Sequence, residues 1–98
     1  MIYKGPNNKM ICQQVQIQNK YGLHTRAAVK LVDMAQRFQS KIELVRDKHN
    51  IDCKSIMSVI TSGAQKGDTF ELKVQGQDET NALKAVKQLI DNRFDESE

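Results

Sequence analysis

The sequence predicts an α+β domain, a two-layer arrangement in which three helices cover one face of a four-stranded antiparallel sheet. Three observations support this prediction. Apolar residues recur with strand-like and helix-like spacing in turn, in the order βαββαβα. Each predicted strand is short and has one apolar face, which is typical of antiparallel sheets covered on one side. The chain has 98 residues, a length that suits a single domain over residues 1–98.

The first part of the chain contains one predicted strand and one predicted helix. Residues 1–10 are mostly polar, and we expect an irregular lead-in there. Residues 11–18 alternate as a strand, which the segment 19–22 ends. From Thr25 the spacing of apolar residues becomes helical. The apolar stripe of this helix consists of Ala28, Leu31, Val32, Ala35 and Phe38.

The middle of the chain is predicted to form a hairpin followed by a short helix. Residues 41–45 alternate as a second strand, residues 47–50 read as a turn, and residues 51–53 form a short third strand. Ser55 is the expected N-cap of the short helix, which Gly63 ends.

The last part of the chain contains the clearest strand and a long helix. Residues 65–68 form a turn, and residues 70–75 alternate strictly between apolar and polar side chains. Asp78 is the expected N-cap of the final helix. The apolar stripe of that helix consists of Ala82, Leu83, Val86, Leu89 and Ile90. Residues 95–98 are expected to form an acidic tail.

Composition and charge exclude several classes of function. The chain is 39% hydrophobic and 28% charged, and its net charge of +3 favours acidic protein partners. With two Tyr, three Phe, no Trp and scattered basic residues, it lacks the stacking surface or basic stripe of a nucleic-acid-binding protein. No apolar run approaches the roughly 18 residues of a membrane helix, and residues 1–10 do not resemble a signal peptide. We therefore expect a cytoplasmic protein.

The sequence gives no indication of a metal site, a cofactor or a hydrolytic centre. Cys12 and Cys53 are expected to be reduced structural thiols, because two cysteines do not make a disulfide framework. No Cys or His pair has metal-ligand spacing, so we expect no metal and no cofactor. Paired carboxylates, a Ser-His-Asp set and a Gly-rich phosphate loop are all missing from the sequence, which argues against a small hydrolase.

The candidate reactive residue is His24, at the predicted boundary between a loop and the first helix. The first N–H groups of a helix have no intrahelical partner, and the helix dipole adds positive potential there. An anion on His24 would meet the N–H groups of Thr25 and Arg26, and the Arg26 side chain would add a charged donor. The same field favours the neutral imidazole, which is the nucleophilic form. On spacing alone a plain cap or surface histidine is the more common case, and His49, in a polar turn, is interpreted as such a surface residue.

Two segments of the sequence, GLHTRAAVKL and KSIMSVITSGAQKGDTFEL, resemble the HPr family of histidine phosphocarriers of the bacterial phosphotransferase system. The resemblance covers residues 11–90 and implies the fold described above. It also implies that His24 is phosphorylated on Nδ1, that Arg26 stabilises the phosphate and that Thr25 contributes its backbone N–H. A protein of this family accepts the phosphoryl group from phosphorylated enzyme I and passes it to an EIIA-type acceptor. It is then a monomeric protein substrate shared by two enzymes, rather than an enzyme.

The resemblance further implies a regulatory residue and a docking patch. Ser55 aligns with the serine that HPr kinase/phosphorylase modifies in some bacteria, and Ile56, Met57 and Ile60 align with the apolar patch that docks on partners. Both features also have ordinary interpretations, since serine is a common N-cap and apolar residues at helical spacing are usually core. A regulatory protein of this fold, controlled at Ser55 and acting by binding alone, is the alternative function. Relatives of that kind lack the histidine, so the presence of His24 argues against it as the sole role.

The chain departs from the family pattern His-x-Arg-Pro-Ala at Ala27, where proline is usual. Proline early in a helix pre-sets φ and lacks an N–H, whereas alanine is a strong helix former. We therefore expect a loss of rigidity rather than of chemistry. The ending RFDESE resembles the nitrogen-related branch of the system, while the segment KSIM resembles the sugar-transport branch, and both branches stay open.

Overall fold

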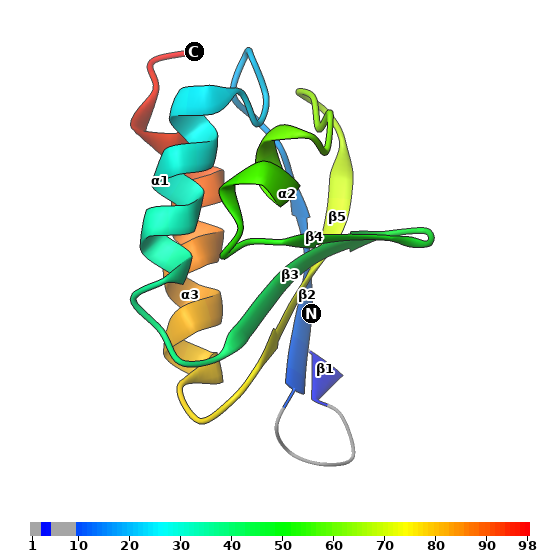
Figure 1. The fold of residues 1–98 in the computed structure, drawn as a ribbon, viewed down its shortest axis with the longest axis vertical. Helices are drawn as coiled ribbons and strands as arrows, with labels where there is room; N and C mark the ends of the chain where they lie inside the picture. The colour runs from blue at the N-terminus through cyan, green and yellow to red at the C-terminus, as the bar shows by residue number, and fades with distance from the viewer. Residues whose placement is uncertain (1–2, 5–9) are drawn as a thin grey trace.

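The protein forms one antiparallel sheet covered on one face by helices, as a computed structural model that describes residues 3–4 and 10–98 shows (Figure 1). The strands are β1 (Tyr3–Lys4), β2 (Met10–Gln16), β3 (Lys41–Arg46), β4 (His49–Asp52) and β5 (Thr69–Gln75). The helices are α1 (Thr25–Ala35), α2 (Ile56–Ile60) and α3 (Glu79–Asp91), followed by a 3-10 turn, η1 (Arg93–Asp95). The strand order is β1-β2-β5-β3-β4, and every neighbouring pair is antiparallel. The predicted α+β fold with four antiparallel strands and three helices is confirmed, with β1 added at the edge.

The first strand is the main departure from the expected layout. The irregular lead-in predicted over residues 1–10 is wrong at Tyr3–Lys4 and at Met10, which begins β2. Tyr3 pairs with Cys12, and Lys4 pairs with Ile11. An edge strand presents unpaired N–H and C=O groups that almost any extended segment can satisfy. This pairing depends on the backbone, so the side-chain pattern of the lead-in did not indicate it.

The hairpin between β3 and β4 is tighter than predicted. Residues 47–50 were expected to form the turn, but His49 pairs with Arg46 and Asn50 pairs with Val45. Only two residues are left between the paired positions, and the first of them, Asp47, has a φ of 54°. Two-residue hairpin loops favour positive φ because that twist matches the twist of the strands, and Asp tolerates it well.

The core lies between the helix-covered face of the sheet and two long helices. Figure 1 shows α1 and α3 side by side along this face, with α2 in contact with α1 and β4. The predicted α3 stripe is buried throughout, and in α1 four of the five predicted positions are buried together with Ala27. The fifth, Phe38, lies beyond the end of α1 and is half-buried against the core. No helix in the described part of the chain is long and apolar enough to cross a membrane.

Both cysteines are buried and free. Cys53 is fully enclosed in the core, and burial raises the pKa of its thiol far above the ordinary value. Burial also raises the pKa of the Cys12 thiol, and the nearby Glu71 carboxylate adds to that effect. Both side chains are therefore protonated at neutral pH and behave as small hydrophobic residues.

Asp78 occupies the N-cap position of α3, as predicted, but its side chain does not cap the helix. Its carboxylate instead accepts hydrogen bonds from the N–H groups of Gln39 (2.8 Å) and Ser40 (2.9 Å) and from the Ser40 hydroxyl (2.5 Å). Ser40 is fully buried immediately before β3, so its polar groups need a partner. The expected capping contact is therefore wrong, because the segment before β3 competes for the same carboxylate.

Candidate functional site

The loop between β2 and α1 places His24 at the N-terminal end of α1. Gly22 has a φ of 63°, which glycine adopts at little cost, and the Leu23 N–H donates to the Ala64 carbonyl (3.0 Å). The side chain of Asn19, fully buried, donates to the Gly22 carbonyl (2.6 Å). These contacts hold the chain immediately before His24, so the position of the histidine is determined by packed backbone rather than by a free loop.

His24 is the N-cap residue of α1, with extended backbone angles (φ −71°, ψ 176°). The first intrahelical hydrogen bond runs from the Ala28 N–H to the His24 carbonyl (2.8 Å). The N–H groups of Thr25, Arg26 and Ala27 precede that bond, and no side chain of the described residues accepts a hydrogen bond from them. The helix therefore begins where the sequence predicts, with three uncompensated donors beside the histidine.

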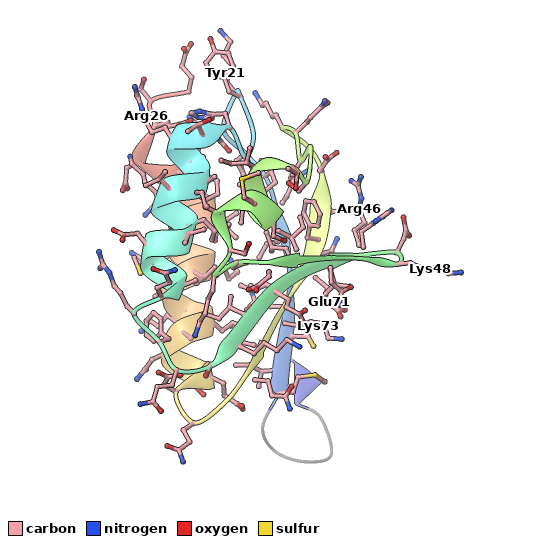
Figure 2. All side chains as sticks on the ribbon, in the orientation of Figure 1. Tyr21, Arg26, Arg46, Lys48, Glu71 and Lys73 are labelled. Atoms are coloured by element: carbon pink, nitrogen blue, oxygen red, sulfur yellow. The ribbon has the colours of Figure 1, made fainter. Side chains whose placement is uncertain are left out.

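A pocket of about 540 Å³ opens beside His24, lined by Tyr21, His24, Arg26, Lys30 and the last four residues of the chain. Figure 2 shows Tyr21 and Arg26 at the same end of the molecule, next to the C-terminal tail. The Tyr21 ring meets the His24 ring edge to face, with centroids 6.0 Å apart. Within the described ranges the exposed Arg26 guanidinium has no ion pair, so it is available to an anion that enters the pocket.

A carboxylate from the tail contacts the histidine directly. His24 Nε2 lies 2.5 Å from Glu96 Oε2, and the other carboxylate oxygen accepts a hydrogen bond from the Asn19 side chain (3.0 Å). Burial raises the pKa of Glu96, but the hydrogen bonds from Asn19 and His24 outweigh it, and the net effect lowers the pKa. Glu96 is therefore ionised at neutral pH and can only accept, so Nε2 must carry the proton.

The opposite ring nitrogen is left open by this arrangement. Among residues 3–4 and 10–98, none forms a hydrogen bond with Nδ1 of His24. A neutral imidazole that has its proton on Nε2 has its lone pair on Nδ1. The His24 side chain is 32% exposed, so this nitrogen is compatible with attack by an external group.

Besides the contact between Glu96 and His24, four contacts hold the tail against α1 and the loop before it. Phe94 is fully buried, its carbonyl accepts from the Lys30 ammonium (2.8 Å), and the Glu98 carbonyl accepts from the Lys20 N–H (3.0 Å). The fourth contact is that of Glu96 with Asn19. Figure 1 shows the tail, in red, beside the N-terminal end of α1.

The remaining predicted residues lie on α2. Ser55 is the N-cap, as predicted, and its hydroxyl accepts from the Ser58 N–H (3.2 Å). Met57 is 61% exposed and Ile60 is 37% exposed, whereas Ile56 is half-buried against the core. Of the predicted docking patch, the structure therefore leaves mainly Met57 and Ile60 at the surface.

His49 lies away from this site. It is exposed at the start of β4, in the hairpin whose tip, marked by Lys48 in Figure 2, projects far from Arg26. The interpretation of His49 as a surface residue is therefore confirmed.

The roles of Asn19 and Glu96 are not apparent from the sequence. Asn19 was part of a segment that ends a strand, and Glu96 was part of an acidic tail. Their contact joins positions 77 residues apart, so no local pattern indicates it. The one local indication was the aromatic residue Phe94 just before the acidic tail, because burial of its ring would bring the tail against the core.

The family model, the relatives and the solved structure that match this chain all point to the same family of proteins. A family model described as the PTS HPr component phosphorylation site matches residues 11–92. The phosphocarrier protein HPr of Treponema pallidum is 44% identical over 87 residues, which cover 89% of this chain and 99% of that protein. The HPr of Cupriavidus necator is 42% identical over 89 residues, covering 91% and 100%. The crystal structure of HPr-C-His from Thermoanaerobacter tengcongensis superposes with a TM-score of 0.84 at 36% identity, over 89% of this chain and 98% of that one.

Proposed function

The chain belongs to the HPr family of phosphocarrier proteins, and from that premise we propose that His24 accepts a phosphoryl group on Nδ1 from enzyme I and passes it to an EIIA-type protein. The family acts as a phosphocarrier rather than as a catalyst. Because phosphoenolpyruvate, the ultimate donor, is a cytoplasmic metabolite, we place this exchange in the cytoplasm. The protein acts in it as a monomer.

The observation that supports this proposal most strongly is the surroundings of His24. One ring nitrogen is held by a carboxylate, while the other has no partner within the described residues, and His24 itself immediately precedes a helix whose first three N–H groups lack intrahelical partners. Phosphoryl transfer spreads negative charge over three equatorial oxygens, and catalysis consists largely of positioning and charge stabilisation. The N–H groups of Thr25 and Arg26, with the Arg26 guanidinium, are the donors for those oxygens.

Ala27 adds a donor that proline would remove. It is the third residue of α1, fully buried, and its N–H precedes the first intrahelical hydrogen bond. A proline there would delete an N–H that has no intrahelical partner and would pre-set φ for the helix. Substitution should therefore leave the chemistry of His24 in place while changing its pre-organisation.

Docking on partners involves the outer face of α2. Met57 and Ile60 are exposed apolar side chains on the helix that packs against α1, and partner contact would remove them from water. Ser55 begins this helix, and its phosphorylation would place a dianion next to Met57. This supports the second candidate function, a regulatory input at Ser55 that weakens docking.

The test is incubation with enzyme I from the same organism and labelled phosphoenolpyruvate. The protein should acquire one label that is stable in alkali and lost in acid, as expected for a P–N bond. His24→Ala should abolish the label, whereas His49→Ala should retain it as the matched histidine control. Ala27→Pro should also retain it, at an equal or higher rate. An unlabelled native protein, or a label that survives His24→Ala, would contradict the proposal.

A further inference from the structure

The C-terminal tail extends past the residues that match the family model, which end at residue 92, and it ends on the candidate site. We propose that Glu96 is a positioning residue for His24: its carboxylate keeps the ring proton on Nε2 and so presents the Nδ1 lone pair to phosphorus. The inference deepens the proposed function of His24 and rests on it.

The position of the Glu96 carboxylate is well determined by its neighbours. Its side chain is only 13% exposed, although it lies at the end of the chain. One oxygen receives the Asn19 amide and the other faces His24 Nε2. Asn19 is itself fully buried and tied to the Gly22 carbonyl, in the same loop that positions His24. Histidine and carboxylate are therefore held by one shared side chain.

The backbone before Glu96 adopts a conformation that needs support from packing. Arg93, Phe94 and Asp95 have φ values of 58°, 54° and 62°, in the left-handed region. Each such non-glycine residue costs about 1–2 kcal/mol relative to the right-handed form. Burial of Phe94 and the hydrogen bond from Lys30 to its carbonyl offset this cost. The tail turns at these three residues, and the turn places Glu96 against His24.

The proton on Nε2 of His24 stays in place throughout phosphoryl transfer. When the Nδ1 lone pair forms a bond to phosphorus, the bond from phosphorus to the donor breaks and its electron pair leaves with the donor. The ring keeps the Nε2 proton and becomes cationic, and the adjacent Glu96 carboxylate compensates that charge, as the aspartate of a serine-protease triad does for its histidine. On transfer to the acceptor, the P–N electron pair returns to Nδ1. The Nε2 proton never has to move.

The other charged and titratable groups around the ring do not make this contact. Tyr21, Arg26 and Lys30 line the pocket on the side of the loop and α1, and Asp95 and Glu98 line it from the tail. The Glu98 side chain is exposed and has no hydrogen bond or ion pair among the described residues, and the tail is held at that position through the Glu98 carbonyl. Glu98→Gln is therefore a control with the same chemical change, on the same segment, outside the contact.

The test combines a spectroscopic and a kinetic readout on Glu96→Gln, Glu98→Gln and the native chain. The ring ¹⁵N shifts of His24 at about pH 8 report the tautomer without any phosphorylation. The native protein and Glu98→Gln should show the Nε2–H tautomer alone, and Glu96→Gln a mixture. Phosphorylation by enzyme I should be about tenfold slower in Glu96→Gln, the lower end of the loss seen when a hydrogen-bonding partner of a metal-bound histidine is removed.

Each outcome of this experiment has a definite meaning. An unchanged tautomer in Glu96→Gln, an unchanged rate, or an equal loss of rate in Glu98→Gln would overturn the positioning role. A native protein that shows the Nε2–H tautomer but takes no phosphate would leave the contact in place and refute the proposed function on which the role rests. The amide spectrum of Glu96→Gln should otherwise match that of the native chain, which excludes a folding defect.

Discussion

Gly22 is the residue whose substitution should test most directly how the His24 loop is held. The substitution to alanine adds one methyl group, at a φ of 63°. The added Cβ atom would lie 2.3 Å from the Ala64 carbonyl oxygen and 2.8 Å from the Gln65 Cα atom, both backbone atoms. Gly63 provides a matched control, because it also has a positive φ (71°) but no atom within 4 Å of an added Cβ.

The expected magnitude follows from the two contributions at Gly22. An L-residue in the left-handed region costs about 1–2 kcal/mol, and the stiffer unfolded chain offsets about 0.4–1 kcal/mol of it. The methyl group also displaces the Ala64 carbonyl, so the buried hydrogen bond from the Leu23 N–H is broken, at about 1–3 kcal/mol. We therefore expect Gly22→Ala to destabilise the protein by about 2–4 kcal/mol and Gly63→Ala by about 1 kcal/mol.

Urea unfolding followed by circular dichroism measures both values, and an unchanged denaturant slope would show that only stability has changed. For a domain of this size the melting temperature of Gly22→Ala should fall by roughly 8–32 °C, at about 4–8 °C per kcal/mol. Equal stability losses in the two variants would refute the close approach of the loop to Ala64. Labelling of His24 should also be slower in Gly22→Ala, measured well below its melting temperature, because the histidine follows this loop.

Two further predictions concern the helix starts. Ser55→Asp should leave the melting temperature nearly unchanged, since Asp caps a helix as well as Ser and its charge suits a helix N-terminus, but calorimetric titration should show several-fold weaker binding to enzyme I. Equal affinities would remove the mechanism proposed for control at Ser55. Hydrogen bonds from the Ser40 hydroxyl and the Gln39 N–H lower the pKa of Asp78. Its contribution to stability is therefore complete above the unfolded value, about 3.9, and is lost as the pH falls through the lower folded value. Asp78→Asn should lower the urea midpoint of unfolding at pH 7. The difference in midpoint between this variant and the native chain should become smaller as the pH falls. A constant difference between pH 7 and pH 2 would contradict this assignment, and Asp33→Asn, at an exposed ion pair, is the control.

Features that depend on local spacing were predictable from the sequence. The α3 stripe and the alternation of β5 match the buried positions, because a helix or strand with one apolar face can only bury that face. The Ser55 hydroxyl caps α2, because capping depends on residues within one turn. His24 lies immediately before α1, where the spacing of apolar residues becomes helical. The sequence by itself therefore determined the layers, most element bounds and the place of the histidine at a helix start.

Tertiary structure decided which long-range partners the polar groups chose. The Asp78 carboxylate binds the segment before β3 instead of its own helix, and β1 pairs with the edge of β2. Glu96 reaches His24 across 72 residues because Phe94 is buried and the backbone turns at residues 93–95. Buried apolar residues recur with the period of their helix or strand, so the sequence shows them. A hydrogen-bonding group can pair with any partner of suitable geometry, and only the packed chain determines which partner comes within reach.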